Sequence, residues 1–239
     1  MKDDTKIGAR IQAVRAEIAA ACTRRTHVPV DAPVELIAVT KNHPVEAMRE
    51  AIDAGVLNIG ENRVQEALDK ARTLERAVTW HLIGHLQTNK VKHAVRQFDL
   101  IHSVDSVRLA QEIDKAAEKI GKVQNILVQV NLAREESKSG VYQEALDEML
   151  ALVDRLSFVR LQGFMCIAPN YEDVEQCRPL FRAMYGLFQQ AKEVAFHRAD
   201  IRYLSMGMTH DYGIAVEEGA NLVRVGTAIF GARQYTLGA

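Results

Sequence analysis

The sequence predicts an α/β fold, a single (β/α)8 TIM barrel preceded by an extra N-terminal helix. Short apolar runs rich in β-branched residues alternate with segments of helical period about eight times along the chain. The connections are short and show no internal repeat or linker, which favours a closed barrel of parallel strands. An open doubly wound sheet is the alternative, but no strand is followed by the Gly-x-Gly-x-x-Gly turn that such sheets often use.

The boundaries of each element follow from hydrophobic period and from glycine and proline. Apolar residues from Ile7 to Ala21 recur at helical spacing, Pro44 closes the first strand, and Gly55 and Gly121 end two helices. We assign one domain to residues 1–239, with the N-terminal helix at about 6–25 and the barrel at about 34–235. We expect strands at residues 34–41, 57–60, 78–83, 100–103, 125–131, 159–165, 201–205 and 222–225. We expect helices at residues 45–54, 62–74, 88–96, 106–120, 143–156, 174–195 and 211–219, then a closing turn at residues 226–231.

Composition and charge disfavour several classes of function. The chain has 239 residues, 48% hydrophobic and 26% charged, with a formal charge of -1, so no global field attracts nucleic acid or an anionic membrane. No apolar run approaches a membrane span, and the first residues carry acids instead of an apolar signal core. Cys22, Cys166 and Cys177 are widely spaced, which disfavours a disulfide framework or a zinc site. We expect a cytoplasmic protein.

Lys41 stands at the end of the first predicted strand, a short apolar run that Pro44 stops. The simpler interpretation is that the strand has ended and the ammonium group lies in water. The alternative is a partly desolvated amine whose pKa falls, so that it attacks an aldehyde and forms a Schiff base. The remaining strand ends decide between these two interpretations.

Polar residues follow most of the predicted strands, where a barrel places its chemistry. Turns favour polar residues in any protein, so each one alone is weak support. Their convergence on one mouth is stronger support. The residues at these strand ends are Lys41, Glu61, Asn62, His81, Ser103, Asn131, Met165, Ser205 and Arg224.

The last two units resemble an anion site. Residues 205–209 form a glycine-containing turn with two hydroxyls, and Gly226 and Thr227 open another turn after the final strand. Loops at these positions are the recurrent phosphate site of the barrel. A reactive lysine and a phosphate site in one mouth indicate a phosphorylated aldehyde, and pyridoxal 5'-phosphate is the obvious candidate.

Arg224 lies two residues before the second turn, so its side chain should enter the mouth. A guanidinium facing the pyridine nitrogen would keep that nitrogen unprotonated and weaken the cofactor as an electron sink. The alternative is that Arg224 only pairs with an acid such as Glu61.

Six motifs stand in order between Leu36 and Tyr235. They are residues 38–41 (AVTK), 59–66 (IGENRVQE), 80–90 (WHLIGHLQTNK), 136–140 (ESKSG), 204–208 (LSMGM) and 223–231 (VRVGTAIFG). Jointly they resemble the YggS/PROSC family of pyridoxal phosphate homeostasis proteins, whose fold is the barrel of the alanine racemase N-terminal domain. Two small departures exist: Asn42 and His43 replace the expected threonine and lysine, and Thr209 replaces a serine while keeping the hydroxyl.

The resemblance implies that Lys41 carries pyridoxal 5'-phosphate as an internal aldimine. It also implies phosphate contacts from Ser205, Gly226 and Thr227, and Arg224 near the pyridine nitrogen. The cofactor-binding residues that we predict are Lys41, Asn62, Ser205, Met206, Thr209, Arg224, Gly226 and Thr227.

We expect a carrier and regulator of pyridoxal phosphate that passes the cofactor to apo-enzymes, and no catalytic residues. A racemase of this type needs a second base from a C-terminal β-domain, and the chain ends at Ala239, shortly after the last barrel turn. An open cofactor face suits loading and release better than carbanion chemistry. Because the missing β-domain also removes the racemase's reason to dimerise, we expect a monomer.

Three alternatives stay open. The first is a monomeric amino-acid racemase that uses Tyr212, His81 or His210 as the second base. The second is a Schiff-base aldolase that acts on a sugar phosphate. A metal site at His81 and His85 is a weaker third, because Gly84 breaks the helix that would align the pair. A separate hypothesis concerns Lys138, either a solvated lysine or an amine that helps the cofactor enter or leave Lys41.

Overall fold

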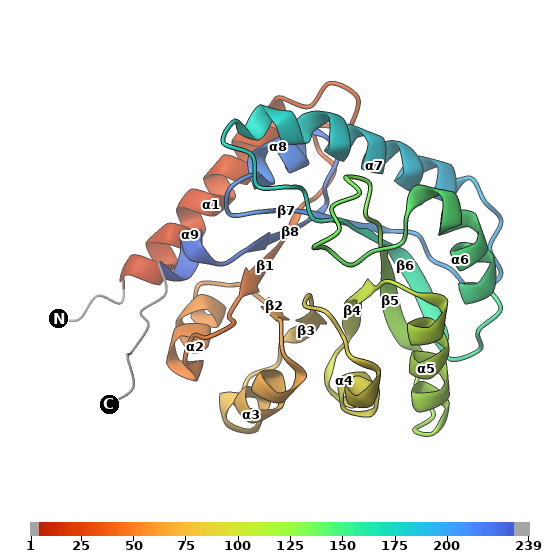
Figure 1. Cartoon of the computed structure of the whole chain (residues 1–239). Coiled ribbons are helices and arrows are strands. Elements are labelled where there is room, and N and C mark those ends of the chain that lie inside the picture. Colours follow the sequence, from red (N-terminus) through yellow and green to blue (C-terminus); the bar gives the residue numbers. More distant parts are fainter. Residues whose placement is uncertain (1–4, 232–239) are drawn as a thin grey trace.

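The computed structural model describes residues 5–231 and forms a closed barrel of eight strands, β1 to β8 in sequence order (Figure 1). Each strand pairs in parallel with the next, and β8 closes the barrel by pairing with β1. The predicted fold class is therefore confirmed, and the open sheet is wrong. Residues 232–235 of the predicted barrel lie outside the described residues.

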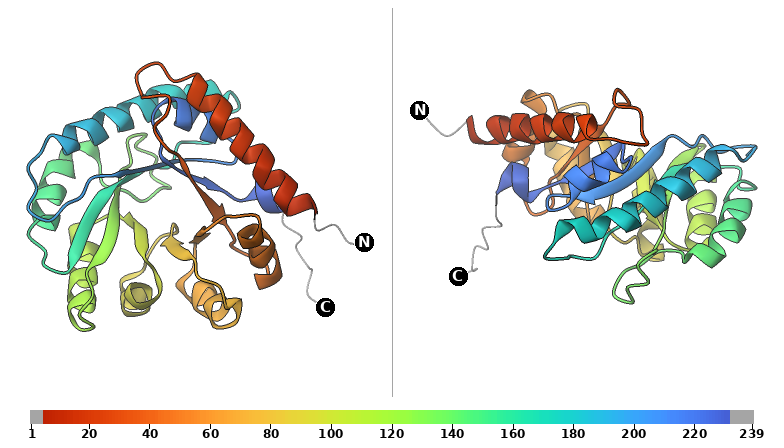
Figure 2. Two further views of the ribbon diagram at one scale, coloured as in Figure 1. Left: turned by 180° about the vertical axis from the view of Figure 1, so that it is seen from behind. Right: turned by 90° about the horizontal axis from the view of Figure 1, so that it is seen from above.

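The elements alternate along the chain, and the helices lie around the outside of the barrel (Figures 1 and 2). The strands are β1 (Glu35–Val39), β2 (Asn58–Glu61), β3 (Thr79–Leu82), β4 (Leu100–Val104), β5 (Gln124–Gln129), β6 (Val159–Met165), β7 (Tyr203–Met208) and β8 (Leu222–Val225). The α-helices are α1 (Thr5–Thr23), α2 (Val45–Asp53), α3 (Val64–Leu74), α4 (Val91–Gln97), α5 (Val107–Glu118), α6 (Leu146–Val153), α7 (Arg178–Lys192), α8 (Tyr212–Glu217) and α9 (Thr227–Phe230). Short 3-10 turns precede three of them: η1 (Thr88–Lys90), η2 (Gln143–Ala145) and η3 (Val174–Cys177).

The apolar core has two layers, because successive strand residues point to opposite faces. Outward residues such as Ala38 and Val223 join the large cluster between the barrel and its helices. Inward residues fill the barrel itself, and this smaller cluster consists of Ile37, Leu100, Leu127, Met165 and Leu222. The interior of the barrel is therefore filled by side chains and is not an open channel.

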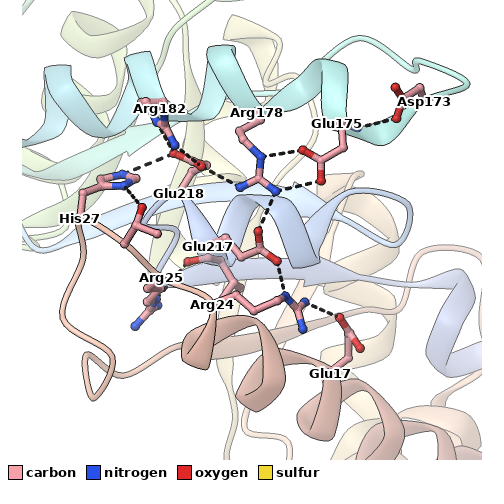
Figure 3. Close-up of polar contacts among 12 residues, drawn as sticks. Glu17, Arg24, Arg25, His27, Asp173, Glu175, Arg178, Arg182, Glu217 and Glu218 are labelled. Atoms are coloured by element: carbon pink, nitrogen blue, oxygen red, sulfur yellow. Dashed lines mark hydrogen bonds and ion pairs between the residues drawn. The ribbon is translucent and has the colours of Figure 1, made fainter.

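A network of ion pairs joins the end of α1 to α8 and joins α8 to α7 (Figure 3). Arg24 of the segment after α1 binds Glu217 at 2.6 Å, and Arg178 of α7 binds Glu217 at 2.7 Å and Glu218 at 2.8 Å. Glu218 is almost fully buried and also binds Arg182 at 2.8 Å. Three segments far apart in sequence are joined by these carboxylates.

The observed boundaries agree with the predicted ones within a few residues, with one informative exception. Residues 205–208 were predicted to begin a turn, but β7 runs on to Met208. The register between β7 and β8 shifts between Ser205 and Met208, and Gly207 has a φ of 88°. The glycine therefore makes a bulge within the strand instead of ending it.

Among residues 5–231, no helix is both long enough and apolar enough to cross a membrane.

Candidate functional site at the barrel mouth

The carboxyl ends of all eight strands meet at one rim, because every strand pair is parallel. Lys41 follows β1 by two residues and is partly exposed. Strand alternation places Lys41 on the same face as Ile37 and Val39, the inward face. Beside them, a Cβ on Gly60 would lie 2.8 Å from Ile37 Cγ2, so only glycine leaves space for this packing. Lys41 thus stands at the mouth, above a tightly packed floor.

Arg224 comes from β8, the strand next to β1, and points into the barrel. Its side chain is almost fully buried. Nη1 donates to Ser205 Oγ at 2.6 Å, and Nη2 donates to the Cys166 carbonyl oxygen at 2.9 Å. Burial lowers the pKa of Arg224 from its ordinary value. In the part of the chain that the structure describes, no carboxylate forms an ion pair with this guanidinium.

Glu61 lies on the opposite face of the strand wall, so the alternative pairing of Arg224 with Glu61 is wrong. Thr40 Oγ1 donates to Glu61, and Lys70 Nζ of α3 binds Glu61 Oε1 at 2.7 Å. Burial raises the pKa of Glu61, and the charge of Lys70 only partly opposes this shift. Lys70 Nζ also donates to the Thr40 carbonyl oxygen at 2.7 Å, immediately before Lys41. This buried group anchors the backbone that carries Lys41.

The turns after β7 and β8 are joined directly. The Gly226 N–H donates to Thr209 Oγ1 at 3.3 Å. Asp211 Oδ1 accepts from the Met208 N–H at 2.6 Å and holds the first turn in shape. Thr227 is exposed beside them. A hydroxyl and backbone groups from two neighbouring strand ends are therefore gathered at one place on the rim, and anion binding there stays a prediction.

Two predicted binding residues lie deeper than the rim. Ser205 is fully buried, and its Oγ is bonded to Arg224 and to His102. Met206 is also fully buried and packs in the outer cluster, so its side chain points away from the mouth. Contacts from either residue to a phosphate stay predictions, and the observed bond makes Ser205 a support for Arg224.

Asn62 stands beside the mouth with an unsatisfied polar atom. Its Oδ1 is buried and finds no hydrogen-bond partner among residues 5–231. Ser103 Oγ, near the end of β4, is likewise buried and has no hydrogen-bond partner among these residues. A Cβ on Gly84 would fall 2.4 Å from the Asn62 carbonyl oxygen, so the two loops approach closely only because residue 84 is glycine. A cavity of about 350 Å³ lies next to Asn62 at this rim. Orphaned buried acceptors of this kind call for a polar partner.

The three candidate second bases lie in different surroundings. His81 points into the barrel, with both ring nitrogens bonded to His102 and Asn58. Tyr212 packs with the outer cluster, and burial followed by the nearby Glu17 charge raises its pKa. The remaining candidate, His210, is exposed, with its Nε2 3.2 Å from the Tyr171 carbonyl oxygen.

The proposed metal pair is also separated. His85 is exposed and lies 3.2 Å from Asp105, whereas His81 is buried inside the barrel. Within residues 5–231, no group of three or more histidine, cysteine or acidic side chains is placed to hold a metal ion.

Lys138 lies on the loop after β5. Asn131 Nδ2 donates to the carbonyl oxygens of Glu135 at 3.0 Å and Lys138 at 3.2 Å, which folds the loop back onto the end of the strand. Lys138 Nζ is exposed and lies 3.7 Å from Glu135 Oε1. Its role in cofactor movement stays a prediction.

Sequence reasoning missed His102. It lies in β4, is fully buried, and bonds both Ser205 and His81. The available signal was a histidine inside an otherwise apolar strand, but only the tertiary pairing shows what it contacts.

A closed parallel barrel with a lysine after its first strand and a buried arginine on its last strand is a barrel of the alanine racemase N-terminal-domain class. The model of that family, "Alanine racemase, N-terminal domain", matches residues 12–234. A pyridoxal phosphate homeostasis protein of Aquifex aeolicus (strain VF5) is 43% identical over 202 residues, which cover 84% of this chain and 88% of the relative. The one of Escherichia coli (strain K12) is 40% identical over 235 residues, which cover 93% and 95%. The chain belongs to the pyridoxal phosphate homeostasis protein family.

Solved structures agree with this assignment. PipY of Synechococcus elongatus PCC7942, determined with PLP bound, is 38% identical, with a TM-score of 0.79 over 94% of this chain and 100% of PipY. An alanine racemase of Clostridium difficile 630 shares the fold alone, at 14% identity and a TM-score of 0.67 over 93% of this chain and 57% of the racemase.

Proposed function

We propose that this protein binds pyridoxal 5'-phosphate and takes part in its homeostasis. The observation that carries the proposal is the mouth itself: Lys41 and a buried Arg224 that forms no ion pair with a carboxylate among the described residues, in a family where PipY binds this cofactor. A buried cation without a counter-charge is costly unless a ligand or several dipoles face it.

The residues present fit this group. Thr209 and Gly226, already joined to each other, supply a hydroxyl and a backbone turn for the phosphate. Arg224 has N–H groups beyond those bonded to Ser205 and Cys166, and it faces the pyridine nitrogen in this proposal. Asn62 offers its orphaned Oδ1 as a further acceptor at the rim. When bound, the cofactor supplies a reactive aldehyde that a lysine amine can hold.

Lys41 is the amine in this proposal. Its nitrogen adds to the aldehyde carbon, one water leaves, and a carbon–nitrogen double bond forms as a Schiff base. Addition of water reverses the step and releases the aldehyde, whereas another amine would take over the carbon–nitrogen double bond and return the free Lys41 amine. The anchor under Thr40, made by Lys70 and Glu61, keeps the Lys41 backbone in place throughout.

A non-catalytic carrier is the role that we propose, with delivery to apo-enzymes as a monomer. Two observations support it: both relatives described above are named homeostasis proteins, and the His81 and His210 rings are already bonded to Asn58 and to the Tyr171 carbonyl oxygen. Light scattering measures the oligomeric state. A chiral assay of alanine with the loaded protein tests catalysis, and turnover at about 1 s⁻¹ or faster, the range of ordinary enzymes, would contradict the carrier role.

The central test is the visible absorption spectrum of the protein with pyridoxal phosphate. Wild type is expected to show a Schiff-base band, and borohydride is expected to fix the cofactor on Lys41, as read by peptide mass. Lys41→Ala should lose both. Lys92→Ala, at an exposed lysine on α4, is the matched control and should keep both. A band that survives in Lys41→Ala, or a wild type that stays colourless, would overturn the proposal.

A further inference from the structure

A continuous series of hydrogen bonds crosses the barrel interior, from the mouth to the opposite end. Arg224 Nη1 donates to Ser205 Oγ at 2.6 Å, and this oxygen lies 3.0 Å from His102 Nδ1. His102 Nε2 is 2.9 Å from His81 Nδ1. We call the residues between the two charged ends the core hydrogen-bond chain: Ser205, His102, His81 and Asn58.

The far end of the core hydrogen-bond chain is a carboxylate. His81 Nε2 lies 3.1 Å from Asn58 Oδ1, and Asn58 Nδ2 donates to Glu35 Oε2 at 3.0 Å. Glu35 is the first residue of β1 and is exposed at the end of the barrel opposite the mouth. The chain therefore has a cation at one end and an anion at the other.

These two ends fix the direction of every bond between them. A guanidinium only donates and a carboxylate only accepts. Ser205 Oγ accepts from Arg224, so its single proton goes to His102 Nδ1. At the other end Asn58 Nδ2 donates to Glu35, which fixes the orientation of the amide. Asn58 Oδ1 therefore accepts from His81 Nε2. Both histidines are then neutral rings that carry their proton on Nε2.

The surroundings of the two rings agree with this assignment. Burial lowers the pKa of His81 to about 3. Burial, followed by His81 and the positive charge of Arg224, lowers the pKa of His102 well below its usual range. Arg224 and Glu35 are the charged groups at the ends of the chain, and neither touches a ring directly. A doubly protonated ring would also place two donors where the chain offers one acceptor.

We infer that His102 and His81 are positioning residues that keep Ser205 Oγ as an acceptor and so aim the Arg224 guanidinium at the ligand. Ser205 and the Cys166 carbonyl take one N–H from each terminal nitrogen, which fixes the plane of the guanidinium. If His102 carried its proton on Nδ1, Ser205 would receive two donors and its own proton would have no partner in the chain. The inference rests on the proposed function for the identity of the ligand.

The tautomers are measured directly on the ligand-free protein. Nitrogen-15 spectra of histidine-labelled wild type should show two neutral rings protonated on Nε2, unchanged between about pH 5 and 8, where an ordinary histidine titrates. His81→Asn and His102→Asn assign the two signals. If His81 or His102 is protonated on Nδ1, or titrates in this range, the inference is overturned whether or not the protein binds pyridoxal phosphate.

Ligand affinity then tests the link to Arg224. His102→Leu removes the acceptor and is expected to weaken binding of pyridoxal phosphate about tenfold, as for one lost hydrogen bond to a charged group. His102→Asn places Oδ1 where Nδ1 was and should recover most of the affinity. His93→Leu, at an exposed histidine of α4, should bind like wild type.

An analogue with C–H in place of the pyridine nitrogen separates positioning from general loosening. If His102 acts through Arg224, wild type and His102→Leu should bind this analogue almost equally. An equal tenfold loss for both ligands, or no recovery in His102→Asn, overturns the inference. Failure of wild type to bind pyridoxal phosphate at all would instead refute the proposed function and leave the tautomer result standing.

Discussion

Gly226 and Thr209 are bonded to each other across two neighbouring strand ends, N–H to Oγ1 at 3.3 Å. The bond joins the turn after β7 to the turn after β8. Each turn alone offers few donors, but together they bring a hydroxyl and backbone N–H groups to one point. This is the place where the proposed function puts the phosphate.

Thr209→Val keeps the shape of the side chain and removes the hydroxyl. Because a hydrogen bond to a charged group contributes about 1.5–3 kcal/mol, the affinity for pyridoxal phosphate should fall roughly 10- to 100-fold. Titration followed by visible absorption measures this. Thr209→Ser is the matched control and should bind like wild type. The weak binding of pyridoxal, which has no phosphate, should not change in any of the three proteins, and a parallel loss for pyridoxal would place Thr209 elsewhere.

Lys138→Ala should slow cofactor transfer to an apo-enzyme while leaving the amount of bound cofactor unchanged. Lys138 is exposed on a loop that Asn131 fastens to the end of β5, so its amine can meet an incoming or leaving aldehyde. Stopped-flow transfer to a pyridoxal-phosphate-dependent apo-enzyme measures the rate. Lys119→Ala, at an exposed lysine at the end of α5, is the control. Equal transfer rates in the two variants and wild type would discard this role.

Much of the site was accessible from sequence because strand alternation is a local rule. Lys41 follows β1 and Arg224 lies in β8, each with the correct parity to face inward, and both strands were predicted within a few residues. The fold class followed from the repeated alternation of strands and helices, because about eight such units with short connections in this length favour a closed parallel barrel.

Other features depend on contacts between distant residues and could not be predicted. Glu61 was a candidate partner of Arg224, yet it faces outward and binds Lys70. Gly207 indicated a turn, because a bulge and a turn both use a glycine with positive φ. His102 joins His81 and Ser205 only because β3, β4 and β7 surround the same interior.

Lys70→Met should destabilise the protein by about 3–5 kcal/mol, the usual cost of leaving a buried charge unpaired. Lys70 is the partner of the fully buried Glu61. Urea unfolding measures the loss, and Arg72→Met, which breaks an exposed ion pair on the same helix, should cost less than about 1 kcal/mol. Lys70→Met with Glu61→Gln should recover part of the stability. A loss no larger than that of Arg72→Met would contradict the buried pair.

Lys70→Met should also change how the free energy of unfolding depends on pH. Burial raises the pKa of Glu61 above its ordinary value of 4.5 even with Lys70 present. A raised carboxyl pKa favours the folded state below pH 4.5, and this contribution is lost as pH rises through the folded pKa. Without Lys70 the pKa rises further, so Lys70→Met should lose stability over a wider range of pH than wild type. If the free energy of unfolding changes with pH in parallel for wild type and Lys70→Met, Glu61 does not titrate in this pH range.

Glu218→Gln should weaken the attachment of α7 to α8 and cost about 1.5–3 kcal/mol, the range for hydrogen bonds to a charged group. The buried Glu218 carboxylate accepts from Arg178 at 2.8 Å and from Arg182 at 2.8 Å and 2.9 Å. Thermal unfolding measures the change. Glu144→Gln, whose carboxylate binds Arg134 on the surface, is the control and should cost less than about 1 kcal/mol.

Glu218 should also make the folded state sensitive to acid. Burial raises its pKa, but the hydrogen bonds from Arg182 and Arg178 outweigh burial and leave it below the ordinary value of 4.5. A lowered carboxyl pKa contributes stability above pH 4.5, and that contribution is lost as pH falls through the folded pKa. Wild type should therefore lose more stability on acidification than Glu218→Gln. Hydrogen exchange in α8, measured at neutral and acidic pH, locates the effect, and an acid response equal in both proteins would assign it to other carboxylates.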